Sequence, residues 1–186
     1  MKRPAGLPRI APLLFLLAIA CGGELLRIDV RQQAETTVEQ GTPLEQLIGD
    51  IGFGDFLNMD ITASQELQNQ GVSPGDITEV WLTQFVIEVE APDGADLAFL
   101  ESVELYIEAP DLPRVLVASA TEFDGQTRVE FELEDVDISD YVISQSMTLD
   151  TEVSGRRPDQ DTDLVADFTL NIGVTQQGAC AAIEAA

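Results

Sequence analysis

The sequence contains no histidine, and its lysine is confined to Lys2. Without histidine the chain cannot activate a serine or cysteine nucleophile through an imidazole, and it cannot bind zinc or iron through one. Without further lysine it lacks the residue used for Schiff bases and for the phosphate of a P-loop. Carboxylates remain as general acids or bases, which leaves a glycan hydrolase with paired carboxylates as the catalytic alternative. Because the chain has only Trp81, Tyr106 and Tyr141 besides phenylalanine to line a sugar cleft, we expect no catalytic residues. No cofactor motif occurs in the sequence, so we expect no bound cofactor.

Positive charge is scarce as well. Three of the nine basic residues lie in the first ten positions, so residues 21–186 keep six basic and all 34 acidic residues, a formal charge of −28. Such a field repels phosphate backbones and anionic lipid headgroups. We therefore expect no nucleic-acid partner, and we interpret the acidic surface mainly as a means of keeping an exported domain soluble.

The N-terminus has the layout of a secretory signal, because Met1–Arg9 is short and positive and Ile10–Ala20 is apolar. A permanent membrane-spanning helix needs about 20 apolar residues, so this shorter run is typical of a signal peptide that is removed. The run ends in Leu17-Ala18-Ile19-Ala20-Cys21-Gly22. This ending resembles the lipobox of bacterial lipoproteins, in which small residues precede a cysteine that becomes the first residue of the mature protein, although Ala18 stands where the family prefers Leu.

The resemblance implies a covalent diacylglycerol and an N-acyl chain on Cys21, which anchor the protein to a membrane of the cell envelope. Gly22 after the cysteine is the pattern of lipoproteins sent to the outer membrane of Gram-negative bacteria. Each buried methylene contributes about 0.8 kcal/mol, so two or three acyl chains anchor a protein stably. The alternative is cleavage nearby by the general peptidase, with Cys21 an ordinary thiol. If Cys21 carries lipid, Cys180 has no intramolecular disulfide partner. We expect Cys180 to be a partly buried or frayed-end thiol, and the alternative is an intermolecular disulfide.

These features divide the chain into a signal peptide (residues 1–20), a short linker with the lipidated Cys21 (21–24), one domain (25–175) and a C-terminal tail (176–186). Within the domain, apolar residues fall on alternate positions in eight stretches, the pattern of strands with one dry face. These stretches are Leu26–Arg31, Leu57–Ile61, Trp81–Val89, Val103–Ile107, Val115–Val117, Val129–Leu133, Met147–Val153 and Leu164–Val174.

Two local signals complete the expected elements. Thr42-Pro43-Leu44-Glu45 predicts the start of a short helix, with a capping threonine and a proline at the first helical position. Asp124-Gly125 predicts a tight hairpin before Val129–Leu133. In the third strand, we expect Trp81, Phe85, Ile87 and Val89 to share the core-facing side.

Eight strands with one dry face each cannot be satisfied by a single sheet, whereas two sheets packed face to face can bury all of them. The sequence therefore predicts an all-β fold, a two-sheet antiparallel β-sandwich of immunoglobulin-like or jelly-roll-like type with one short helix. A closed barrel is the alternative.

Three carboxylates in a predicted loop, Asp159, Asp161 and Asp163, are weak candidate ligands for calcium, because hard cations prefer several oxygens at one point. A second acidic group could add ligands if the fold brought it close, and it consists of Glu134, Asp135, Asp137 and Asp140. The interpretation we favour is a solvated turn whose charges are answered by Arg156 and Arg157, with no bound metal.

The Arg156-Arg157 pair is the one doublet of positive charge after the signal peptide. Arginine forks recognise carboxylates, so the doublet could dock an acidic partner, although a local structural role is preferred. Taken together, the sequence predicts a lipid-anchored, non-catalytic envelope protein that serves as a binding, assembly or structural module for an unknown protein partner. The alternative from another class is a lipid carrier that holds an acyl chain between its sheets.

Overall fold

The computed structural model describes residues 26–41, 67, 69, 71–144, 147–156 and 158–175. The strands in this part of the chain are β1 (Leu26–Val38), β2 (Ile77–Ala91), β3 (Leu100–Glu108), β4 (Val115–Ala120), β5 (Arg128–Glu130), β6 (Glu132–Leu133), β7 (Thr148–Gly155) and β8 (Thr162–Val174). A 3-10 helix, η3 (Pro74–Asp76), precedes β2, and a one-turn helix, α3 (Ser139–Ile143), precedes β7. The predicted helix at Thr42-Pro43-Leu44-Glu45 and the predicted strand Leu57–Ile61 lie outside the described residues, as do Cys21 and Cys180.

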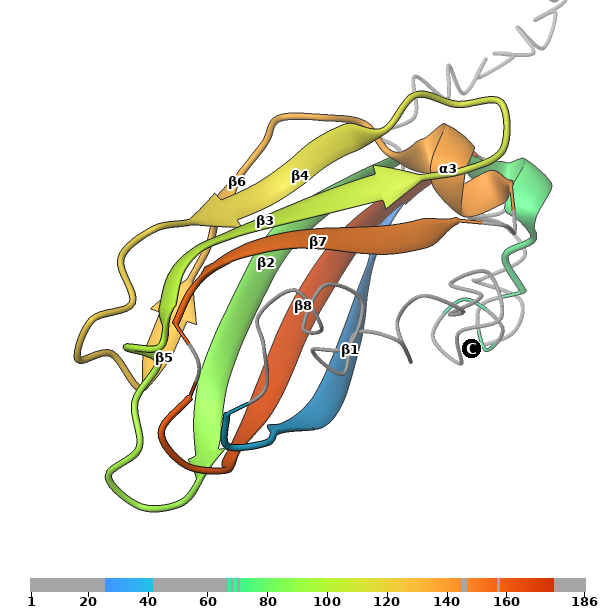
Figure 1. The fold of residues 1–186 in the computed structure, drawn as a ribbon. Helices are drawn as coiled ribbons and strands as arrows, with labels where there is room; N and C mark the ends of the chain where they lie inside the picture. Colours follow the sequence, from blue (N-terminus) through green and yellow to red (C-terminus); the bar gives the residue numbers. More distant parts are fainter. Residues whose placement is uncertain are drawn as a thin grey trace, which may run out of the picture.

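The strands form two antiparallel four-stranded sheets packed face to face, which confirms the predicted β-sandwich (Figure 1). The first sheet has the order β1-β8-β2-β5, and the second has the order β6-β4-β3-β7. The chain passes from the first sheet to the second after β2, returns to the first at β5, crosses to the second again at β6 and returns to the first at β8. Each sheet therefore contains strands from distant parts of the sequence.

The core lies between the sheets and is built from the alternate apolar residues of each strand. β8 lies between β1 and β2, and its six inward residues from Leu164 to Val174 are each no more than 7% exposed, as their alternation predicts. In the second sheet, Val103, Leu105 and Ile107 of β3 face the same core and are 3% exposed or less. Within the described residues, every buried side-chain nitrogen and oxygen has a hydrogen-bond partner.

β2 departs from the predicted alternation in its first half. Its pairing with β8 shifts between Ile77 and Glu79 and again after Leu82. As a result Val80, opposite Ile172, points into the core and is fully buried, whereas Trp81 lies opposite Asn171 on the outer face. The prediction that Trp81 faces the core was wrong, because each β-bulge inserts one residue and reverses the facing of what precedes it. From Phe85 to Val89 the predicted facing is correct.

The stretch predicted as one strand, Val129–Leu133, belongs to both sheets. β5 pairs with β2 in the first sheet, and β6 pairs with β4 in the second. Phe131 lies at the change of sheet, 4% exposed, with its ring edge-on to Phe85 at a centroid distance of 4.7 Å and to Phe123 at 6.2 Å.

Asp124-Gly125 does form a turn, closed by a hydrogen bond from the N–H of Gln126 to the carbonyl of Phe123 at 3.0 Å. The strands on its two sides, β4 and β5, lie in different sheets, however. The predicted tight hairpin was therefore wrong in its pairing: β4 meets the returning chain only at β6.

The sandwich has two distinct ends. The α3 end holds the first residue of β1, the helices η3 and α3, and the β3–β4 loop (Figure 1). At this end the N–H of Ile138 donates to the carbonyl of Val80 at 2.9 Å, and the hydroxyl of Tyr141 donates to the carbonyl of Pro113 at 2.7 Å. The far end holds the β7–β8 loop, where the N–H of Gly41 donates to the carbonyl of Pro158 at 3.0 Å.

Candidate functional site

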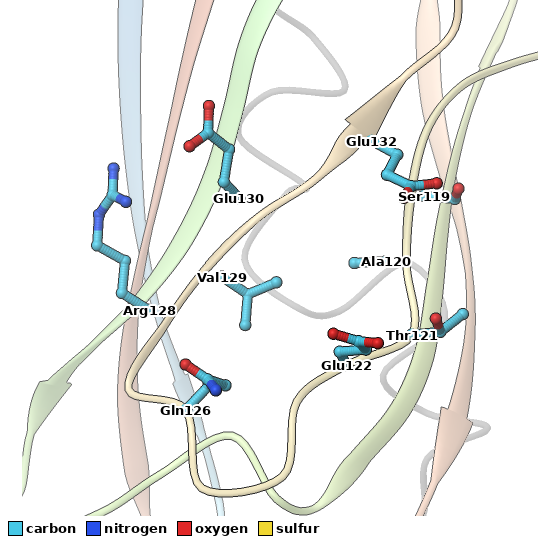
Figure 2. Close-up of a pocket in the computed structure, with 9 residues that line it drawn as sticks. All are labelled: Ser119, Ala120, Thr121, Glu122, Gln126, Arg128, Val129, Glu130 and Glu132. Atoms are coloured by element: carbon cyan, nitrogen blue, oxygen red, sulfur yellow. The ribbon is translucent and has the colours of Figure 1, made fainter.

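A hollow of about 390 Å³ lies between the end of β4 and β5, and we call it the β4–β5 groove (Figure 2). β4 pairs with β6 only at Ala118–Leu133 and Ser119–Glu132, and beyond these pairs the two stretches of chain diverge because β5 joins the other sheet. The groove is lined by Ser119, Ala120, Thr121, Glu122, Gln126, Arg128, Val129, Glu130 and Glu132. The same change of sheet that buries Phe131 therefore opens this groove.

Two hydrogen bonds determine which way the backbone of β5 faces. The N–H of Phe131 donates to the carbonyl of Phe85 at 3.0 Å, and the carbonyl of Thr127 accepts a hydrogen bond from β2 at 2.8 Å. Backbone groups of successive residues point to opposite sides of an antiparallel strand. Arg128 and Glu130 therefore direct their N–H and C=O groups away from β2 and toward the β4–β5 groove.

The side chains give the groove an acidic rim and an apolar floor. Figure 2 shows the side chains of Arg128 and Glu130 on the outer side of the strand and that of Val129 on the groove side. Val129 is 8% exposed, so it joins the core below the groove. On the outer face, Nε of Arg128 forms an ion pair with a carboxylate oxygen of Glu88 at 3.5 Å. The carboxylates of Glu122 and Glu132, with the hydroxyls of Ser119 and Thr121 and the amide of Gln126, make the site suited to hydrogen bonding and to positive charge.

The three calcium candidates of the sequence lie at the far end, Asp159 and Asp161 in the β7–β8 loop and Asp163 in β8, and their three carboxylates make separate contacts. The backbone carbonyl of Asp159 accepts from the Gln40 side chain at 2.6 Å, and a carboxylate oxygen of Asp161 accepts from the Gln40 N–H at 2.7 Å. A carboxylate oxygen of Asp163 accepts from the hydroxyl of Thr37 at 2.6 Å. In the described part of the chain, no three His, Cys, Asp or Glu residues are grouped so that they could hold a metal ion.

The second acidic group lies at the α3 end instead. A carboxylate oxygen of Asp137 accepts from the N–H of Val80 at 3.0 Å and from the N–H of Ser139 at 2.9 Å. Val80 pairs with Ile172, which lies nine residues along β8 from Asp163, roughly 30 Å for an extended strand. The fold therefore does not bring the two acidic groups together.

Arg156 makes its described contacts within its own surroundings. Its Nε donates to the carbonyl of Ala98 at 3.1 Å, and its guanidinium pairs with Asp159 at 3.2 Å, where the two side chains are 58% and 84% exposed. A hollow of about 120 Å³ lies beside them at the far end. Arg157 lies outside the described residues. The contacts of Arg156 join the β7–β8 loop to the loop before β3.

Sequence reasoning missed a charged cluster on the outer face of the second sheet. Arg114, just before β4, contacts carboxylates of Glu108 at 3.1 Å, Asp150 at 2.7 Å and Glu152 at 2.7 Å. Its guanidinium lies 3.4 Å from the ring centroid of Tyr106, a cation–π contact. The alternation of β3 places Tyr106 and Glu108 on the wet face, but the approach of β7 and of Arg114 depends on strand pairing. The cluster links β3 and β7 to the residue that precedes β4.

The same cluster shifts two pKa values. Burial opposes the charge on Arg114, but its hydrogen bonds to Asp150 and Glu152 outweigh this and raise its pKa. The pKa of Tyr106 is raised, first by the 2.9 Å hydrogen bond that its hydroxyl donates to Glu104, then by burial and by nearby carboxylates, with Arg114 acting in the opposite direction. Both shifts favour the protonation states that hold the cluster together.

Among the residues that the structure describes, no helix is long and apolar enough to cross a membrane. No protein-family model matches the chain, and no curated protein is detectably similar to it. What the chain does must therefore be inferred from its own residues and geometry.

Proposed function

We propose that this chain is a lipid-anchored, non-catalytic protein of the bacterial cell envelope that binds a protein partner through the β4–β5 groove. The observation that carries the proposal is the lipobox-like segment Leu17–Gly22, which lies just before the first strand of a β-sandwich that begins at Leu26. The anchor is a diacylglycerol and an N-acyl chain on Cys21, and Gly22 after that cysteine supports the outer membrane as its location.

The groove suits an extended segment of a partner. Arg128 and Glu130 offer backbone N–H and C=O groups toward it, and a peptide that adds to an open strand edge bonds such groups. Its carboxylates, Glu122 and Glu132 among them, attract basic side chains. The formal charge of −28 on residues 21–186 adds a long-range attraction for a basic partner surface.

The lipid carrier gains little support from the described residues. The hollows of about 390, 120 and 340 Å³ all have a largely polar lining, whereas an acyl chain needs an apolar one. Between the sheets, the rings of Phe85, Phe123 and Phe131 pack against one another in the core. No specific observation favours the glycan hydrolase either.

The anchor is tested by intact mass of the protein purified from cell membranes. The expected N-terminal residue is Cys21, and the expected mass includes a diacylglycerol and an N-acyl chain. Cys21→Ser should remove both the acyl mass and the membrane association. A secreted product that begins beyond Cys21 and carries no acyl mass would contradict the proposal.

The groove is tested by photo-crosslinking in living cells, with a photoreactive phenylalanine analogue in place of Thr121 and, as a control, in place of Glu101 on β3. We expect a discrete protein adduct from position 121 and none from position 101. Glu130→Pro removes an N–H that faces the groove and is not part of the β2 ladder, a position where strands tolerate proline. This variant should abolish the adduct, whereas Glu130→Gln should keep it.

Equal adducts from positions 121 and 101 would refute binding at the groove. An adduct at position 121 that survives Glu130→Pro would mean that the backbone of β5 takes no part in binding.

A further inference from the structure

We propose that the α3 end of the sandwich rests on the phospholipid surface, with Leu26 and Ile143 in contact with the bilayer, so that the domain stands end-on from the membrane. This inference rests on the proposed lipid anchor and adds to it an orientation and a contact surface. In the part of the chain that the structure describes, Leu26 and Ile143 are the large apolar side chains that are exposed, each at 37%.

Both side chains lie at the same end of the molecule. Leu26 is the first residue of β1 and lies opposite Val174, the last residue of β8. Ile143 is the last residue of α3, whose start is fixed to β2 through Ile138. Figure 1 shows α3 at the end of the sandwich where β2 begins. The exposed apolar side chains are therefore grouped at one end.

The anchor reaches this end and not the other. From Cys21 to Leu26 the chain advances five residues, which span at most about 17 Å when fully extended. The thirteen residues of β8 run the length of the first sheet, roughly 40 Å at strand spacing. A lipid on Cys21 therefore brings the α3 end to the bilayer and leaves the far end beyond the reach of the tether.

The charge on the outer face of β1 argues against the sandwich lying flat on the membrane on that face. The outer face of β1 carries Asp29, Arg31 and Glu35 at alternate positions, and all three are exposed. Laying this face on the bilayer would place both signs of charge against the headgroups, whereas the α3 end offers apolar contact.

The contact is apolar and not electrostatic, because the α3 end carries exposed carboxylates, Asp111 in the β3–β4 loop and Asp140 in α3. Binding geometry should therefore not depend on anionic lipid. The end-on position also has a consequence for the proposed partner site. β4 starts near the α3 end and runs toward the far end, and the β4–β5 groove lies at the end of β4. The groove is therefore held away from the bilayer.

The test uses the full lipidated chain, purified from membranes and inserted into vesicles of phosphatidylethanolamine and phosphatidylglycerol. In a Cys180→Ser background, a fluorophore is attached at Ile143→Cys near the bilayer or at Gln160→Cys, an exposed residue of the far end. Vesicles that contain nitroxide-labelled lipid should quench the fluorophore at position 143 and leave that at position 160 unchanged. Leu26→Cys should be quenched like position 143, which keeps the test valid if one labelled variant fails to fold.

Raising the salt concentration or omitting phosphatidylglycerol should leave the quenching at position 143 unchanged, since the contact is apolar. Equal quenching at positions 143 and 160, or none at either while the lipidated chain remains on the vesicles, would overturn the end-on orientation and leave the anchor intact. A chain without acyl mass would overturn the proposed function and the orientation with it.

Discussion

Replacing Phe131 with alanine should cost more stability than a change at either adjacent residue. Phe131 lies where the chain passes from the first sheet to the second, 4% exposed, and its ring packs edge-on against Phe85 and Phe123. Its backbone N–H is held by the carbonyl of Phe85 at 3.0 Å. The ring therefore fills the corner at which the two sheets are joined by a single strand.

The expected loss can be worked out from the buried ring. A phenylalanine side chain removes on the order of 150 Å² or more from water, which at about 25 cal/mol per Å² amounts to about 4 kcal/mol. Measured losses for Phe→Ala in protein cores span about 3–5 kcal/mol, since the cavity adds to the transfer term. Phe131→Leu keeps most of the apolar volume and should cost about 1.5 kcal/mol or less.

The assay is urea unfolding of the unlipidated Cys21→Ser chain, followed by the fluorescence of Trp81. With a slope of about 2 kcal/mol per molar urea, Phe131→Ala should lower the midpoint by about 2 M. Glu130→Gln is the matched control at the exposed neighbouring position and should stay within about 0.5 kcal/mol of the parent. A loss below about 1.5 kcal/mol for Phe131→Ala, or an equal loss for Phe131→Leu, would refute the view that this ring holds the corner.

Three further predictions concern a glycine, a tyrosine and calcium. A Cβ at Gly155 (φ 152°) would collide with the carbonyl oxygen of Phe99, so Gly155→Ala should lower the free energy of unfolding in urea by about 3 kcal/mol. Gly75 has open space around it, so the control Gly75→Ala should change that free energy by less than about 0.5 kcal/mol. The fold raises the pKa of Tyr106 above 10.0, so the stability that its protonated hydroxyl contributes is complete below pH 10 and is lost as the pH rises through the folded-state pKa. Glu104→Gln should reduce this alkaline loss of stability, and an unchanged dependence of stability on pH would contradict the role of the Tyr106–Glu104 hydrogen bond. Millimolar calcium in place of EDTA should leave the melting temperature unchanged, since the carboxylates of Asp159, Asp161 and Asp163 bond separate partners. A rise of several degrees would show a calcium site.

Local patterns were sufficient to identify most strands and their dry faces. In β8 and in the stretch from Arg128 to Leu133, apolar residues fall on alternate positions, and the positions that the alternation predicts to face the core are buried or half-buried. Val165 of β8 departs from the alternation, since it is apolar and 9% exposed. A period of two residues is a property of the strand itself, so it can be read without knowledge of the partner strand. Eight such strands then leave few ways to bury their faces, and the sandwich follows.

The errors occurred where one residue or one partner changes the outcome. The bulges that place Val80 inward and Trp81 outward arise from the pairing with β8, and no local signal marks them. α3 has five residues, too few for a helical period to be visible, and it is held by the burial of Tyr141 and Val142. The turn at Asp124-Gly125 was recognised, but the sheet to which the following strand belongs was not.

The candidate site illustrates the same division. The sequence alone determined the lipobox-like segment before Cys21, the excess of carboxylates and the succession of amphipathic strands, because each is a pattern among near neighbours. The tertiary structure alone decided that Arg128–Leu133 is shared between two sheets and opens the β4–β5 groove, and that Arg114 meets carboxylates from β3 and β7. Register and sheet membership depend on contacts between residues far apart in the chain, and these are selected by the packing of the whole core.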